Sequence, residues 1–218
     1  MPVVSLTDLM EKDLPTIKYA IPQILPCGLC LLAGRPKVGK SWLALSLGLS
    51  VAYGKPVLGS DNLVPEKGPV MFCALESSEN ELQQERLPLM LEAMNLEGDE
   101  EMFFSTEMQR LPAGIDQMQH HLTLMPETRM FVIDIFTKIK AQKSSFKANN
   151  IYDSEYEMLA QLQKFALENN VSVLLVHHTR KPGQNASSFD EISGSTAMTG
   201  AADTLMLLTR DKRRELWI

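Results

Sequence analysis

A glycine-rich segment that ends in lysine and serine constrains the fold of this chain more than any other feature. Its sequence is Gly34-Arg35-Pro36-Lys37-Val38-Gly39-Lys40-Ser41. It matches G-x-x-x-x-G-K-[ST] at every fixed position, between an apolar run at 29–33 and apolar residues at helical spacing from Trp42 onward. A strand, a tight loop and a helix in this order predict a phosphate-binding loop. The alternative, a glycine-rich turn between a buried strand and a helix, is disfavoured by this setting.

Each fixed position of the segment has a chemical reason. Without a Cβ, Gly34 and Gly39 let the backbone turn and approach a phosphate closely. The N–H groups of the loop and the positive end of the helix beginning near Gly39 then face the anion. Lys40 would reach the β- and γ-phosphates of a nucleotide, and Ser41 would place its hydroxyl on Mg²⁺. We therefore expect the whole stretch from Gly34 to Trp42 to form a nucleotide site.

The composition is that of one ordinary globular domain. The chain has 218 residues, and no shift in composition demands a second domain. The longest apolar runs fall far below the ~18 residues that span a bilayer, and residues 1–5 lack the basic start of a signal peptide, so we expect a cytoplasmic protein without membrane contact. A net charge of −6 argues against a surface broadly suited to nucleic acid. Any DNA contact must therefore come from particular loops.

The apolar pattern alternates between strands and helices along the chain. Residues 1–28 contain several prolines and are predicted to form an extended N-terminal arm, and residues 29–218 a single domain. Strands are predicted at 29–33, 70–75, 102–105, 130–134, 171–176 and 204–208. Helices are predicted at 40–53, from 78 to about 98 with a kink at Pro88, at 115–124 and at 151–169. This alternation predicts an α/β fold with a mainly parallel central sheet flanked by helices.

Polar residues follow the predicted strands at the edge where ligands of such sheets bind. Asp134 ends the apolar run 130–133, as the carboxylate that holds Mg²⁺ does in phosphate-loop enzymes. An aspartate in this position can also be a simple helix or turn cap. The phosphate loop upstream favours the magnesium interpretation.

Glu76 and His178 end two other predicted strands. Glu76 could orient or deprotonate a water that attacks the γ-phosphate, or it could merely be an acid at the N-terminus of the following helix. His177 and His178 are neighbours on a strand, so they point to opposite faces and only one should reach the site. We prefer His178 as a polar group that responds to the γ-phosphate, against a solvated histidine at a strand end.

Five segments of the chain together resemble a known family. They are residues 34–41, Ala74-Leu75-Glu76, Val132-Ile133-Asp134, Val176-His177-His178 and Gly194-Ser195-Thr196-Ala197-Met198-Thr199-Gly200-Ala201-Ala202-Asp203. In this order they are similar to the RecA-type ATPases of the RepA/DnaB helicase group, often labelled an AAA-type domain. The resemblance covers about residues 20–210 and implies a RecA-like fold of the P-loop NTPase class.

The resemblance also implies roles for individual residues. Glu76 matches the catalytic glutamate, Asp134 the Mg²⁺ aspartate, and His178 the group that senses the γ-phosphate. Arg210 matches the arginine that completes the site of a neighbouring subunit. ATP is the nucleotide that the resemblance implies, with Lys40 as its principal cation.

A six-membered ring that moves single-stranded DNA is the assembly that the resemblance implies. The segment 138–150 could form a channel loop through Lys138, Lys140, Phe146 and its other lysines, Lys143 and Lys147. A solvated loop or a nucleotide lid is the alternative for these residues. The segment 181–199 is the second candidate for DNA contact. A recombinase-like DNA-pairing ATPase and a non-catalytic, nucleotide-gated regulatory module remain alternatives to the helicase.

The end of the sequence departs from the pattern of the family. Relatives usually continue beyond the strand at 204–208, whereas residues 213–218 resemble the beginning of a strand whose partner is absent. We therefore expect a C-terminally truncated ATPase domain. An unpaired sheet edge would weaken ring assembly without preventing nucleotide binding.

Overall fold

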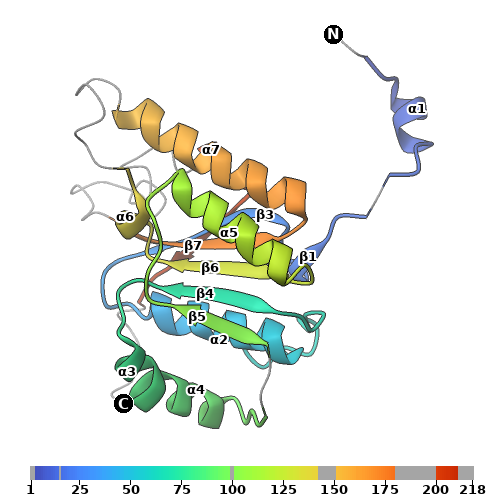
Figure 1. Cartoon of the computed structure of the whole chain (residues 1–218). Helices are drawn as coiled ribbons and strands as arrows, with labels where there is room; N and C mark the ends of the chain where they lie inside the picture. Colours follow the sequence, from blue (N-terminus) through green and yellow to red (C-terminus); the bar gives the residue numbers. More distant parts are fainter. Residues whose placement is uncertain (1–2, 15, 99–100, 142–150, 180–199, 211–218) are drawn as a thin grey trace.

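The centre of the fold is a six-stranded sheet, seen in a computed structural model that describes residues 3–14, 16–98, 101–141, 151–179 and 200–210 (Figure 1). Its strands are β3 (Gly28–Gly34), β4 (Val70–Ala74), β5 (Met102–Ser105), β6 (Met130–Asp134), β7 (Ser172–His178) and β8 (Thr204–Leu208). They lie in the order β5-β4-β6-β7-β3-β8, and all neighbouring pairs are parallel. The predicted α/β class with a mainly parallel sheet is therefore confirmed.

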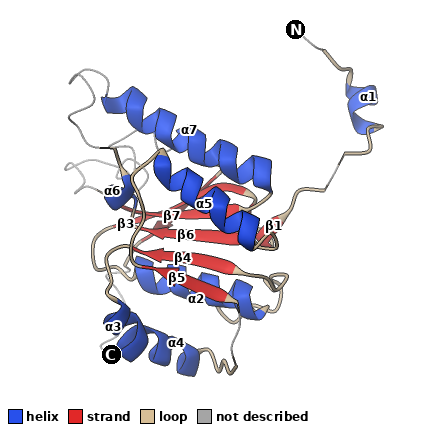
Figure 2. Ribbon diagram, in the orientation of Figure 1, coloured by secondary structure: helices blue, strands red, loops and turns tan. Residues whose placement is uncertain are grey.

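Helices cover both faces of this sheet (Figure 2). Helices α5 (Ala113–Leu124) and α7 (Ile151–Asn169) lie on one face, and α2 (Lys40–Tyr53) lies on the other. Each layer has its own buried apolar cluster, and the strands contribute alternate residues to the two clusters. Burial on both faces explains why the inner strands β3 and β6 are continuous apolar runs. No helix in the described part of the chain is long and apolar enough to cross a bilayer.

The register of the sheet brings the polar strand ends together. Gly34 at the end of β3 pairs with His178 at the end of β7, and Ala74 of β4 pairs with Asp134 of β6. Glu76 comes two residues after the end of β4, so it lies at the same edge. The carboxyl ends of parallel strands meet at one edge, and this edge therefore collects the polar groups that the sequence pattern singles out.

The N-terminal segment is more structured than its prolines suggest. Helix α1 (Leu6–Met10) projects away from the body (Figure 1), whereas β1 (Tyr19–Ile21) and β2 (Leu25–Pro26) form an antiparallel pair. Ile21 and Leu25 of this pair are fully buried in the core cluster on the α2 side. Within the predicted arm, residues 19–26 thus pack as part of the folded body.

A π-helical turn interrupts the helix predicted from residue 78. It spans Leu82–Arg86 (η1) between α3 (Glu79–Glu81) and α4 (Leu87–Ala93), and the Leu87 N–H donates to the carbonyl of Leu82. Pro88 has no N–H to donate, so the helical hydrogen bonding is already irregular next to it. Ser78 is the N-cap, because its Oγ accepts from the N–H of Glu81 at 3.2 Å. This is one half of a capping box; the Glu81 carboxylate does not complete the box but accepts a hydrogen bond from Arg86.

Candidate nucleotide site

The glycine-rich segment forms the loop between β3 and α2. Gly39, the N-cap of α2, has φ +104°, a conformation that favours glycine. Arg35, Pro36 and Lys37 are exposed, and Val38 is half-buried. The loop therefore presents its backbone to solvent at the start of a long helix, the arrangement that binds anions.

Lys40 lies inside this loop. Its side chain is only 4% exposed, and its Nζ donates to the carbonyls of Gly34 at 2.9 Å and Arg35 at 2.8 Å. Burial lowers the pKa of Lys40, and the nearby Asp134 and Glu76 carboxylates oppose that shift. A buried ammonium held by carbonyls at the mouth of the loop is positioned to bind an anion there.

Gly34 has a second role that the sequence pattern does not disclose. A Cβ on this residue would lie 2.6 Å from the carbonyl oxygen of Leu208 in β8 and 3.4 Å from Cδ of Lys40. The first distance is a clash with backbone, which cannot move aside cheaply. Glycine is thus needed here for the close approach of β8 to β3, independently of any phosphate.

Asp134 and Ser41 form the part of the site that could hold a metal ion. Asp134 is 3% exposed, its Oδ1 has no hydrogen-bond partner among the described residues, and the Ser41 side chain lies near enough to its carboxylate to lower the pKa. Burial raises the pKa of Asp134, and Ser41 and Lys40 counteract the shift. A buried carboxylate oxygen without a partner, beside a hydroxyl, fits a hard cation such as Mg²⁺.

The remaining ligands of such an ion would come from elsewhere. The described residues contain no cluster of three or more His, Cys, Asp or Glu side chains that could hold a metal ion. Mg²⁺ is commonly held by one or two protein groups together with substrate phosphates and water. The Ser41–Asp134 pair matches that mode of binding.

Glu76 and His178 contact each other across the sheet edge. The distance between Glu76 Oε2 and His178 Nε2 is 3.7 Å, and the Glu76 side chain is 42% exposed. Burial and the Lys40 ammonium lower the pKa of His178, whereas Glu76 raises it. The net direction is downward, so His178 is largely neutral at pH 7 and can stay beside Glu76 without neutralising it.

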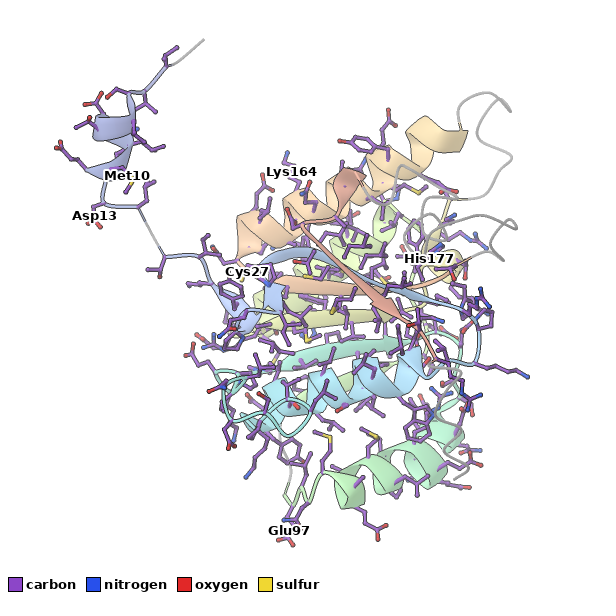
Figure 3. The ribbon with its side chains drawn as sticks, turned by 180° about the vertical axis from the view of Figure 1, so that it is seen from behind. Met10, Asp13, Cys27, Glu97, Lys164 and His177 are labelled. Carbon is purple, nitrogen blue, oxygen red and sulfur yellow. The ribbon has the colours of Figure 1, made fainter. Side chains whose placement is uncertain are left out.

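His177 points away from this contact, as the alternation along a strand predicts. Its ring packs edge-on against Phe136 with centroids 6.2 Å apart. Figure 3 shows His177 at the end of the sheet opposite Cys27. Burial lowers the pKa of His177 to about 4.

The half-buried His177 predicts acid sensitivity of the fold. Between its ordinary pKa of 6.5 and about 4, the unfolded chain binds a proton at this residue while the native protein does not. The free energy of unfolding should therefore fall as the pH drops through this window, by up to about 3 kcal/mol from this group. Urea unfolding of wild type and His177→Phe at pH 7.5 and 5.0 measures the effect. An equal loss in both proteins would contradict it.

Trp42 and Arg86 lie on the α2 side of the site. Trp42 is 39% exposed, and the Arg86 guanidinium stands 5.8 Å from its ring centroid. Arg86 also forms a 2.6 Å ion pair with Glu81 and lowers the pKa of Asp134. The sequence interpretation missed Arg86, because no motif marks it.

Arg210 lies apart from the other predicted residues. It is exposed and follows β8, the edge strand of the sheet. Among the described residues no ion pair joins it to Glu76 or Asp134. A location at an edge suits a residue that acts on another subunit, and that role stays a prediction.

Only part of the predicted DNA-contacting segments belongs to the described residues. Lys138 is exposed in α6 (Phe136–Ile139). Lys140 is already engaged, since its Nζ is 2.6 Å from Glu155 Oε1 and 5.0 Å from the ring centroid of Phe136. Residues 142–150, with Lys143, Phe146 and Lys147, and all of 181–199 lie outside the described residues.

Comparisons with known proteins agree with this geometry. The family model AAA_25, described as an AAA domain, matches residues 2–184. No curated protein matches the sequence. Many solved structures are similar to the chain, and two of them each have 14% identity and a TM-score of 0.63. One is described as an ATPase domain, and the match covers 87% of this chain and 72% of that chain.

The second similar structure is a DnaB-like replicative helicase, described with its interactions with primase. The match covers 86% of this chain and 49% of that one, so the chain spans about half the length of the helicase. At this identity the likeness concerns the fold. Together with the family match over most of the sequence, it shows that the chain belongs to the AAA domain family and has the RecA-like P-loop fold found in helicase ATPase domains.

Proposed function

We propose that this protein binds Mg-ATP, hydrolyses its γ-phosphate and uses the turnover to move along single-stranded DNA. The observation that carries the proposal is the meeting of three groups at one sheet edge. They are the Lys40 ammonium in the loop, the Ser41–Asp134 pair, and the Glu76–His178 contact. A cation for phosphate, oxygens for a metal and a carboxylate for water are the parts that phosphoryl transfer needs.

In this proposal the loop binds the phosphates. Lys40 would exchange its bonds to the Gly34 and Arg35 carbonyls for bonds to phosphate oxygens, which carry full charges and accept more strongly. Ser41 and Asp134 would hold Mg²⁺, which supplies neutralisation of the developing phosphate charge. The raised pKa of Asp134 would fall once a cation lies beside it, because the ion favours the charged carboxylate.

Replacement of Lys40 by methionine tests the binding step. Lys40→Met is expected to weaken ATP binding by about 10²-fold, since two charge-assisted hydrogen bonds are lost. Folding should persist, because burial already disfavours the charged form of Lys40. Titration with a fluorescent ATP analogue measures the affinity, and Lys55→Met controls for loss of charge, because Lys55 is exposed and follows the far end of α2. ATP binding as tight as in wild type would contradict the assignment of Lys40.

Glu76 is proposed to orient and deprotonate the attacking water. Its side chain is accessible, and the neutral His178 beside it can accept or donate a hydrogen bond as the γ-phosphate departs. The alternative role, an acid at a helix N-terminus, is less needed because Ser78 already caps α3. The carboxylates for metal and for water are thus separate residues.

The assembly is proposed to be a homo-oligomeric ring, six-membered as the family resemblance suggests. Arg210 would then lie at the interface and act on the ATP of the neighbouring subunit. The likeness to a DnaB-like helicase supports such a ring without specifying it for this chain.

Steady-state ATP hydrolysis with and without single-stranded DNA tests the proposed function. The protein concentration should span the range over which subunits assemble. Turnover that rises with DNA and with concentration is the expected result. Hydrolysis indifferent to DNA would contradict the motor and favour a regulatory ATPase. ATP binding without hydrolysis would contradict the enzyme altogether, and salt-sensitive filaments on DNA in place of rings would favour a recombinase-like protein.

A further inference from the structure

A groove of about 440 Å³ adjoins the candidate nucleotide site at the same edge of the sheet. It lies beyond the ends of β4 and β5 and beside α6. Six of its lining residues carry the argument: Leu75, Glu107, Met108, Gln109, Gln117 and Lys138. Its volume is in the range of pockets that bind small molecules or single nucleotides.

The backbone that lines the groove continues directly into Glu76 and Asp134, the two carboxylates of the candidate site. Leu75 precedes Glu76, and its N–H donates to the carbonyl of Asp134 at 2.7 Å. Lys138 lies in the short helix that follows Asp134. The opposite wall is formed by residues 107–109. Leu111, two residues further along the chain, ties this wall to the helix, because its N–H donates to the carbonyl of Ile139 at 2.8 Å. A ligand in the groove would therefore touch backbone that continues directly into the nucleotide site.

The polar groups in the groove are held in place. The backbone N–H of Gln109 donates to Oε1 of Gln117 at 2.8 Å. The NH₂ group of the Gln117 side chain takes no part in this hydrogen bond. Ser105 Oγ donates to the carbonyl of Glu107 at 2.6 Å and fixes the turn after β5. The amides can therefore meet a ligand at defined positions with little loss of entropy.

The chemistry of the lining divides the groove into two parts. Leu75 and Met108 supply apolar surface, and the neighbouring carboxamides supply donors and acceptors for the edge of a base. The Glu107 carboxylate accepts hydrogen bonds from base amino groups and repels phosphate. Lys138, exposed at the rim, attracts phosphate. Apolar surface with amides and a lysine at the rim matches one nucleotide, with the base inside and its phosphate outside.

We propose that this groove binds one nucleotide of single-stranded DNA, with the base against Leu75 and Met108 and the phosphate at Lys138. The inference rests on the proposed DNA-dependent ATPase activity. It adds a base-binding site that is separate from the two segments expected to contact DNA, 138–150 and 181–199, except for Lys138. DNA bound here would press on the wall that carries Glu76, a direct route from DNA binding to hydrolysis.

Fluorescence anisotropy with a labelled single-stranded oligonucleotide, measured over a range of salt concentrations, tests the groove in the full chain. Lys138→Ala should weaken binding about tenfold and reduce the slope of log affinity against log salt by about one. Gln117→Ala should weaken binding about fivefold without changing that slope, because it removes a contact to a base. The matched controls are Lys164→Ala and Gln119→Ala, in the separate groove between α5 and α7, and they should bind like wild type.

Photo-crosslinking adds a readout that does not depend on affinity. An oligonucleotide carrying 5-iodouracil should crosslink to the peptide that contains Met108. The DNA-binding role of the groove would be overturned by crosslinks only to other peptides. It would also be overturned if the Lys138→Ala and Gln117→Ala variants bound DNA like their controls. Either result would leave the proposed function standing. A wild-type protein that hydrolyses ATP but neither binds DNA nor responds to it would overturn both.

Discussion

Replacement of Glu76 by glutamine should lower the rate of ATP hydrolysis by about 10³-fold, the usual contribution of a positioned general base. Affinity for ATP should change little, because Glu76 lies beyond β4 and not in the phosphate loop. The side chain is 42% exposed and the substitution keeps its shape, so the fold should tolerate it. Single-turnover hydrolysis at saturating Mg-ATP measures the chemical step, and a fluorescent ATP analogue measures binding.

Glu79→Gln provides the matched control for Glu76→Gln. Glu79 is the first residue of α3, so it has the helix N-terminal position that the alternative explanation assigns to Glu76. If Glu76 were only a favourable charge at this helix, both substitutions would reduce stability slightly and neither would affect turnover. Equal turnover in Glu76→Gln and Glu79→Gln would thus remove Glu76 from the mechanism.

Much of the sheet was predictable because its strands are short apolar runs, fully buried in β6 and partly buried in the edge strands β5 and β8. The runs at 102–105, 130–134 and 204–208 coincide with β5, β6 and β8. The strand predicted at 171–176, with His177 and His178 at its end, corresponds to β7. The backbones of His177 and His178 pair with Ala33 and Gly34, and this pairing with β3 determines where β7 ends.

The N-terminal hairpin was harder to predict for a different reason. Prolines around residues 19–26 indicate extended chain, which is correct locally. They do not indicate that Ile21 and Leu25 are buried against α2 and its neighbours. A two-stranded pair this short has no periodicity of its own, and only its contacts with the core define it.

The site was predictable where a motif or a strand end marks a residue. Lys40, Glu76, Asp134 and His178 are brought to one edge, as the parallel topology requires. Arg86 and the groove could not be predicted in this way. The groove depends on β5 lying beside β4, which joins residues 75, 105–109 and 138, and the order of strands does not follow from apolar patterns.

Loss of the Arg210 side chain should lower turnover by about 10³-fold in assembled protein, if the arginine acts on the ATP of a neighbour. ATP binding should survive, because Arg210 contacts neither Lys40 nor Asp134 within its own chain, as far as the described residues show. Arg129→Ala is a suitable control, since Arg129 is paired with Glu66 and lies before β6, at the opposite edge of the sheet. Steady-state hydrolysis across protein concentrations measures the effect.

Mixing two inactive variants separates action across an interface from action within a chain. Arg210→Ala subunits keep Lys40, and Lys40→Met subunits keep Arg210. In a randomly mixed ring about a quarter of the interfaces would combine an intact Lys40 site with an intact arginine from the neighbour, so hydrolysis should reappear at that order. An arginine that acts within its own subunit cannot be rescued in this way. Mixtures as inactive as their components would therefore contradict a composite site, whereas recovered hydrolysis would require the subunits to share it.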